Sequence, residues 1–203
     1  MGSYTTNLPV NGKFNITAVF GQSGSLWKNG HKGIDIVSND KTIYSVCDGS
    51  VTVVGYDKDG WGRYVSVKPN GFERIRIILC HLKEGSIKVK KGDSVTRKSV
   101  IGTMGSTGNS TGVHLHIEMR IDNCAVDISS YLGVKNEIKS GLLDTDFKVS
   151  DKEQDKMFNS LLAAFDKDSS TEEISELKNE LEKVKKELAA AQKIIAAVKM
   201  ALV

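Results

Sequence analysis

Residues 105–120 have the sequence GSTGNSTGVHLHIEMR, a loop of small residues followed by an alternating segment. Successive side chains of an extended strand point to opposite faces, so His114 and His116 share one face, while Leu115 and Ile117 share the other. One face of the predicted strand is therefore polar and the other apolar. The chain has only four histidines, so the placement of two of them on one strand face is informative.

The segment His31-Lys-Gly-Ile-Asp35 shows the same alternation. A strand there would place His31, Gly33 and Asp35 on one face. If this strand lies beside the histidine strand, two imidazoles and one carboxylate converge. Imidazole nitrogen and carboxylate oxygen are good zinc ligands, and three of them leave one tetrahedral position for water, as in catalytic zinc sites. Each motif alone is weak evidence, because a single histidine is usually an ordinary polar residue.

The first two thirds of the chain have the pattern of an antiparallel sheet. Short β-branched runs are interrupted by Gly, Asn or Asp, and helical periodicity is absent. Hairpins are predicted around Asp48-Gly49, which suits a two-residue turn, and around Pro69-Asn70-Gly71. The predicted strands cover residues 42–47, 50–55, 63–68, 73–80, 95–104 and 113–120. We therefore expect a β-rich domain over residues 1–133.

The remaining third of the chain has helical periodicity. Ser150 and Glu153 have the spacing of a capping box that opens one helix, and Ser170 and Glu173 repeat that spacing before a longer one. We expect a helical linker over residues 134–169.

Residues 170–203 carry apolar side chains at alternating spacings of three and four. These are Ile174, Leu177, Leu181, Val184, Leu188, Ala191, Ile195, Val198 and Leu202. The spacing is typical of a coiled coil, so we expect this segment to join copies of the chain into a homo-oligomer. A single amphipathic helix that packs on the preceding domain is the alternative. The number of helices in the coiled coil stays open.

Composition excludes several classes of protein. Residues 1–133 carry 16 basic and 11 acidic side chains, and residues 134–203 carry 12 and 14. The basic side chains are dispersed and no nucleic-acid recognition motif is present, so no nucleic-acid partner is expected. Three cysteines without Cys-x-x-Cys spacing argue against a disulfide framework. No apolar run approaches the roughly 20 residues of a membrane-spanning helix.

From about residue 20 to about residue 132 the sequence resembles the lysostaphin/LytM-type zinc metallopeptidases, which cut cell-wall peptidoglycan. The segments that carry the resemblance are Phe20-Gly21, residues 31–36, 48–51, 81–82, 89–95, 101–102, 105–112 and 114–118. The order of these segments makes coincidence a poor explanation. The resemblance implies a β-rich antiparallel metallopeptidase domain, here followed by the helical tail.

The resemblance also implies a set of site residues. It implies one zinc ion per chain, bound by His31, Asp35 and His116. His81 and His114 would be catalytic imidazoles next to the metal. Every histidine of the chain would then have a role.

Glu118 shares the strand face of the H-x-H pair, and three roles stay open for it. It could support a ligating imidazole, since such rings usually donate their second nitrogen to an acceptor, act directly, or be purely structural. The sequence departs from the family at Val113, where proline is usual, and at Leu79-Cys80, where Tyr-Ala is usual. These departures bear on substrate contacts.

The implied function is zinc-dependent hydrolysis of peptide bonds in the stem or cross-bridge peptides of bacterial peptidoglycan. The first residues, MGSYTTNLPVNG, lack the pattern of a secretory signal. We therefore expect the enzyme to reach the cell wall by release on lysis or as part of a virion, as a phage-encoded lysin or a virion tail-associated hydrolase does.

Two other functions are weighed against this one. In the first, Cys80 is a nucleophile with a histidine base, although its neighbour His81 would point to the opposite strand face. In the second, the chain is a structural component of a larger assembly, with an inactive metallopeptidase fold and a coiled coil that joins the copies. Inactive relatives usually lack zinc ligands, and all three candidates are present here.

Overall fold

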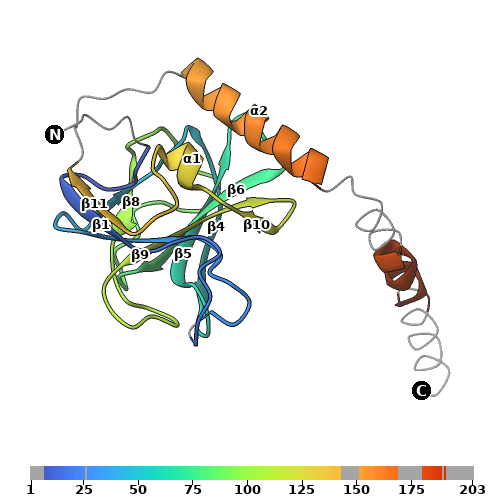
Figure 1. Ribbon diagram of the computed structural model, residues 1–203, viewed down its shortest axis with the longest axis horizontal. Coiled ribbons are helices and arrows are strands. Elements are labelled where there is room, and N and C mark those ends of the chain that lie inside the picture. Colours follow the sequence, from blue (N-terminus) through green and yellow to red (C-terminus); the bar gives the residue numbers. More distant parts are fainter. Residues whose placement is uncertain (1–6, 26, 143–150, 169–179, 189, 191–203) are drawn as a thin grey trace. The chain divides into compact units, whose positions relative to one another are not determined.

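The computed structural model describes residues 7–25, 27–142, 151–168, 180–188 and 190. The chain divides into two compact units, residues 1–158 and 159–203. Eleven strands are described, and all of them belong to the first unit (Figure 1). Nine of these strands form one sheet and two form another.

The large sheet has the strand order β11-β1-β2-β9-β6-β5-β4-β7, with β10 paired to β9 outside this path. Its strands are β1 (Lys13–Ala18), β2 (Ile34–Ser38), β4 (Gly49–Asp57), β5 (Gly62–Pro69), β6 (Ile75–Leu82), β7 (Ser94–Val95), β9 (Leu115–Ile121), β10 (Cys124–Val126) and β11 (Lys139–Leu142). Every neighbouring pair is antiparallel. The prediction of a β-rich antiparallel domain is therefore confirmed.

Strand β9 lies at the centre of this sheet, between β2 and β6. Its alternation is the one predicted from the H-x-H segment, and Leu115, Ile117 and Met119 are completely buried. Apolar side chains of β2 and β6, including Ile36 and Leu79, are buried with them. The buried apolar face stabilises the sheet and leaves the opposite face of β9 for polar side chains.

The hairpin predicted around residues 69–71 is confirmed, because β5 and β6 pair on either side of it. The hairpin predicted around Asp48-Gly49 is wrong. Strand β3 (Thr42–Tyr44) pairs with β8 (Val100–Thr103) in the two-stranded sheet, and β4 pairs with β5. Gly49 is the first residue of β4, where a Cβ would be 2.2 Å from the Lys68 carbonyl oxygen. The glycine is needed for close approach of two strands and not for a turn.

The strand predicted over residues 95–104 is interrupted. Strands β7 and β8 are separated by a turn in which Lys98 has a φ angle of 72°. Its backbone N–H donates to the Ser45 carbonyl oxygen at 2.9 Å. The segment therefore contributes one strand to each sheet, β7 to the large one and β8 to the small one.

The segment after residue 133 contains a strand as well as a helix. Strand β11 pairs with β1, and helix α2 (Asp151–Asp168) follows the undescribed residues 143–150. The predicted helix is confirmed, whereas its capping residue Ser150 lies outside the described residues. The helix begins in the first unit and continues into the second.

The first turns of α2 are anchored on the β domain. Phe158 is 2% exposed and stacks on Tyr131 of the short helix α1 (Ser129–Leu132), with ring centroids 4.6 Å apart. The Phe72 ring also contacts the Phe158 ring, with centroids 4.8 Å apart. The buried Gln154 side chain donates to the Val46 carbonyl oxygen at 2.9 Å. The domain core therefore includes residues well beyond position 133.

The described part of the C-terminal segment is residues 180–188 and 190, which are helical. Leu181, Val184 and Leu188 lie three and four positions apart and are each more than half exposed. The rest of the predicted coiled coil lies outside the described residues. In the described residues, no helix combines the length and the apolar character that a membrane crossing requires.

Replacing Phe158 by alanine should destabilise the domain by about 3 kcal/mol, because a buried aromatic ring between two others is lost. The measurement is the free energy of unfolding by urea denaturation. Lys156→Ala, an exposed site on the same helix, is the control and should change that energy little. Equal stability of the Phe158→Ala variant and the wild type would show that α2 is not anchored on this core.

Candidate metal centre

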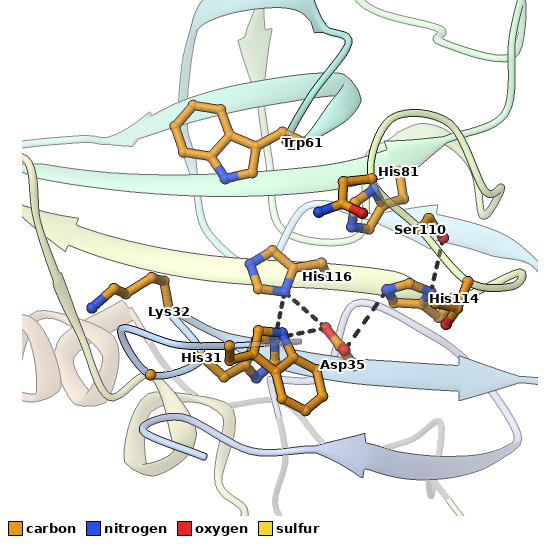
Figure 2. Close-up of a pocket in the computed structure, with 13 residues that line it drawn as sticks. His31, Lys32, Asp35, Trp61, His81, Ser110, His114 and His116 are labelled. Atoms are coloured by element: carbon orange, nitrogen blue, oxygen red, sulfur yellow. Dashed lines mark hydrogen bonds and ion pairs between the residues drawn. The ribbon is translucent and has the colours of Figure 1, made fainter. Parts of the chain in front are cut away.

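The pairing of β2 with β9 brings three potential metal ligands together (Figure 2). Asp35 lies directly opposite His116 in the register, and His31 lies three residues before the first residue of β2. His116 Nδ1 is 2.7 Å from Asp35 Oδ1, and His31 Nε2 is 3.0 Å from that nitrogen and 3.1 Å from that oxygen. All three side chains are buried. The predicted adjacency of the two segments is confirmed.

The alternation predicted that His31 lies in the strand, but His31 lies before it. Strand β2 begins at Ile34, and Gly33 packs against β9 so closely that a Cβ would be 2.2 Å from the Ile117 carbonyl oxygen. His31 is held instead by backbone hydrogen bonds with Gln22 and Gly21, both at 2.8 Å. The close approach at Gly33 lets the segment before β2 reach the polar face of β9.

Oxygen acceptors fix the outer nitrogens of both imidazoles. His31 Nδ1 donates to the Val19 carbonyl oxygen at 3.0 Å, and His116 Nε2 donates to Glu118 Oε1 at 3.0 Å. In the neutral rings, the inner nitrogens then carry lone pairs that face the Asp35 carboxylate. Three acceptors directed at one point form a site for a cation.

The donor set fits zinc. Two imidazole nitrogens and one carboxylate oxygen are ligands that zinc prefers, and bonds of that ion place its ligand atoms about 3.3 Å apart in a tetrahedron. The observed separations of 2.7 to 3.1 Å come close to that spacing. Three protein ligands leave a fourth position open to the pocket, as in catalytic zinc sites.

Charge around His116 favours a cation at the same point. Burial lowers the pKa of His116, but hydrogen bonds to Asp35 and Glu118 outweigh burial and raise it to about 9. Burial raises the pKa of Asp35, and its contacts with His116 and His31 more than reverse this effect. Carboxylates on both sides of one imidazole therefore favour positive charge between them, supplied by a proton or a metal ion.

Glu118 contacts the His116 nitrogen that faces away from Asp35. It is 2% exposed, and it also accepts hydrogen bonds from Trp61 Nε1 at 2.8 Å and Arg120 Nε at 2.7 Å. Burial raises the pKa of Glu118, but its partners, His116 first, lower it overall. The carboxylate is thus ionised and fixed by three donors, and it contacts the candidate metal site through His116.

The two remaining histidines lie next to this group (Figure 2). His81 Nδ1 donates to the Thr107 carbonyl oxygen and His114 Nδ1 to the Gly112 carbonyl oxygen, both at 2.8 Å. The two ring centroids are 4.7 Å apart, and His114 Nε2 is 3.7 Å from Asp35 Oδ2. Burial is the main reason that the pKa of His81 is lowered to about 4. His81 is therefore neutral near pH 7, with its Nε2 lone pair available.

All four histidines line one pocket of about 210 Å³. Its walls include Trp27 and Trp61, which are the two tryptophans of the chain. Trp27 also contacts the His31 ring, with centroids 4.7 Å apart. Sequence reasoning identified neither tryptophan, because no spacing relates them to the histidine motifs. The pocket offers an apolar surface next to the imidazoles.

Cys80 does not share this pocket. It is completely buried in β6, and the pKa of its thiol is raised well above the ordinary value, chiefly by burial. A protonated thiol without access to the pocket cannot act as a nucleophile. The alternative of a cysteine peptidase is therefore wrong for this residue.

Residues 29–128 match the family model described as peptidase family M23. Peptidoglycan DD-endopeptidase ShyB of Vibrio cholerae is 37% identical over 98 residues, which cover 48% of this chain and 22% of that protein. The chain spans about a fifth of the length of the curated relatives to which it is similar.

Solved structures with a similar fold include two peptidases. A zinc-containing peptidase from Vibrio cholerae aligns with a TM-score of 0.53 and 28% identity, over 67% of this chain and 41% of that one. The catalytic domain of the antimicrobial peptidase lysostaphin from Staphylococcus simulans aligns with a TM-score of 0.52 and 25% identity, over 58% of this chain and 90% of that one. The similarity therefore extends across nearly all of the lysostaphin catalytic domain.

The lowered pKa of His81 predicts a pH-dependent stability. The folded state releases this proton near pH 4 and the unfolded state near 6.5, so the unfolded chain binds more protons between these values. The free energy of unfolding should fall by about 1–3 kcal/mol as pH falls from 6.5 to 4 because of this group. Denaturation at pH 7 and pH 5 should show a smaller fall for His81→Gln than for the wild type. Equal falls would contradict the prediction.

Proposed function

We propose that this chain, whose residues 29–128 form a domain of peptidase family M23, is a zinc-dependent endopeptidase that hydrolyses peptide bonds in bacterial peptidoglycan. The observation that carries the proposal is the convergence of His31 Nε2, Asp35 Oδ1 and His116 Nδ1 within 3.1 Å of one another. Two further imidazoles beside this group supply acid–base chemistry. The family match supports the reaction class.

We assign zinc binding to His31, Asp35 and His116, with one ion per chain. When bound there, the ion lowers the pKa of a water molecule to about 7 and polarises the carbonyl group of the scissile bond. All three ligand residues line the pocket, so the ion would act on a substrate bound there. Glu118 supports His116 from behind by accepting its Nε2–H, which fixes the ring orientation.

His81 and His114 are assigned the proton transfers. Each ring donates Nδ1–H to a backbone carbonyl oxygen, so each presents Nε2 as the reactive nitrogen. A neutral Nε2 can take the proton from the attacking water, and the protonated ring can then stabilise the oxyanion and return a proton to the leaving amine. The order in which the two histidines act is a matter for kinetics.

Peptidoglycan is proposed as the substrate because the similar sequences include a peptidoglycan DD-endopeptidase. Trp27 and Trp61 would bind apolar parts of the stem or cross-bridge peptide. The excess of basic side chains in residues 1–133 favours binding to an anionic wall. The enzyme would act at the bacterial cell wall, and we propose the setting of a phage lysin or a virion tail-associated hydrolase.

Residues 170–203 are proposed to form a coiled coil that joins several copies. The support is the apolar spacing of the sequence and, in the described residues, the exposed leucines and valine at positions 181, 184 and 188. Linked catalytic domains would gain avidity for a repetitive polymer through a raised effective concentration.

Replacing a ligand and replacing a proton carrier should have different effects. His31→Ala should lose zinc, because one of three protein ligands is gone, and should lose hydrolysis with it. His81→Ala should keep a zinc content of one ion per chain and lose turnover by about 100-fold or more. Metal analysis and release of fragments from purified peptidoglycan measure the two effects. Near-native turnover of the His81→Ala variant would contradict the assigned roles.

Inhibitors test the reaction class in the wild-type protein. A zinc chelator should abolish peptidoglycan hydrolysis, and added zinc should restore it. A thiol alkylator should have little effect, because Cys47 and Cys80 are buried and the exposed Cys124 does not line the pocket. A zinc-loaded chain that releases no fragments from any defined peptidoglycan would support the inactive structural component instead.

Charged substitutions in the C-terminal segment test the oligomer. Leu181→Asp combined with Leu188→Asp should lower the mass measured by light scattering to that of the monomer, because carboxylates would be buried between helices. Lys183→Asp combined with Lys186→Asp changes exposed positions off the apolar stripe and is the control. A wild-type protein that is monomeric at micromolar concentration would refute the coiled coil.

A further inference from the structure

The hydroxyl group of Thr107 is inserted between two paired strands beside the pocket. Thr107 Oγ1 accepts a hydrogen bond from the Arg63 backbone N–H of β5 and donates one to the Leu82 carbonyl oxygen of β6, both at 2.8 Å. Arg63 and Leu82 are register partners in the ladder. The side chain of a distant loop therefore bridges backbone groups of two strands that face each other.

The bridge lies at an irregularity in the ladder. Arg63 pairs with Leu82 and Val65 pairs with Leu79, so β6 has one more residue than β5 over this interval. The extra length includes His81, which has a φ angle of 58°, a conformation rare for residues other than glycine. The His81 backbone N–H points to the Trp61 carbonyl oxygen, at 2.8 Å, outside the β5–β6 ladder. This bulge directs the His81 side chain into the pocket (Figure 2).

Thr107 also holds the imidazole of His81. The Thr107 carbonyl oxygen accepts the Nδ1–H of His81 at 2.8 Å. A carbonyl oxygen cannot donate, so this contact selects the tautomer in which Nε2 carries the lone pair. Thr107 thus contacts the bulge through its hydroxyl group and the imidazole through its backbone.

Close backbone packing keeps Thr107 in place. A Cβ on Gly62 would lie 2.2 Å from the Thr107 carbonyl oxygen, and a Cβ on Gly108 would lie 2.2 Å from the Gly62 nitrogen. Only glycine fits at either position, so the loop that contains Thr107 sits directly on the start of β5. A small displacement of this loop would therefore also move the carbonyl oxygen that orients the His81 ring.

We propose that Thr107 is a positioning residue for His81: its hydroxyl group closes the β5–β6 bulge, and its carbonyl oxygen fixes the orientation and tautomer of the imidazole. The inference rests on the proposed function, in which His81 transfers a proton. Its structural content, the tautomer and the bulge, can be measured without any substrate.

The first test compares Thr107→Val with Thr107→Ser in the full, zinc-loaded chain. Valine keeps the shape and removes the hydroxyl group, so kcat for peptidoglycan hydrolysis should fall at least about 10-fold with little change in KM or zinc content. Serine keeps the hydroxyl group and should retain most of the activity. Thr52→Val is the matched control, because Thr52 Oγ1 bonds the Ser66 carbonyl oxygen at 3.2 Å across the β4–β5 irregularity, away from the pocket.

A double-mutant cycle separates positioning from general destabilisation. In a His81→Gln background, Thr107→Val should cause no further loss of kcat, because the group it positions is absent. The inference is overturned if the loss is the same in both backgrounds, if kcat of Thr107→Val stays within twofold of the wild type, or if Thr52→Val loses as much.

A readout independent of catalysis distinguishes failure of this inference from failure of the proposed function. Side-chain ¹⁵N NMR, with the His81 signals identified by their loss in His81→Gln, should show the Nδ1–H tautomer in the wild type and in Thr107→Ser. In Thr107→Val the tautomers should be mixed or the Nδ1–H should exchange faster. An unchanged His81 spectrum in Thr107→Val overturns the inference, whereas a wild type with this tautomer and no hydrolysis overturns only the function.

Discussion

The pairing of β2 with β9 is the constraint on which the candidate site depends. Backbone hydrogen bonds place Asp35 opposite His116 and Ile34 opposite Ile117, so the polar pair and the apolar pair lie on opposite faces. A slip of one residue would exchange these faces and bury the carboxylate in the core. The apolar core therefore helps to fix the ligand geometry, because a register shifted by one residue would expose isoleucines and bury charge.

All four histidine rings are oriented by the same kind of hydrogen bond. One ring nitrogen of each is bound by an oxygen acceptor, and the other faces the pocket or the shared ligand point. The acceptors are the carbonyl oxygens of Val19, Thr107 and Gly112 and the carboxylate of Glu118. This arrangement selects one tautomer for each neutral ring and limits rotation. Ligating and proton-transferring imidazoles are thus prepared by the same kind of contact.

Sequence reasoning succeeded where a side-chain pattern encodes the structure. The alternation around His116 identified a strand with one polar face, and the H-x-x-x-D segment proved to lie beside it. It failed where backbone packing is decisive. The Asp48-Gly49 pair predicts a turn, although Gly49 is needed for the close contact between β4 and β5. The positive φ angle of His81 also left no trace in residue types.

The parts of the site that sequence did not reveal share a physical cause. Three of the four acceptors that orient the histidines are backbone carbonyl groups, which every residue carries. Their positions follow from loop conformation, and no choice of side chain marks them. The two tryptophans come from separate loops whose meeting depends on the complete sheet order. A family resemblance carried the assignment of His81, because its residue type alone offered little.

The charges in the site argue that metal binding and folding are coupled. Glu118 is buried but is compensated by Arg120 and by the indole N–H of Trp61. Asp35 is 8% exposed, and in the described part of the chain its ion-pair partners are all histidines, with no lysine or arginine. A buried carboxylate needs a positive partner, and imidazoles provide one only when protonated. A divalent cation among the three donor atoms would meet this need in place of the proton that His116 otherwise holds. Because the ligand point forms only when β2 and β9 pair, the free energy of binding such an ion would stabilise the folded domain.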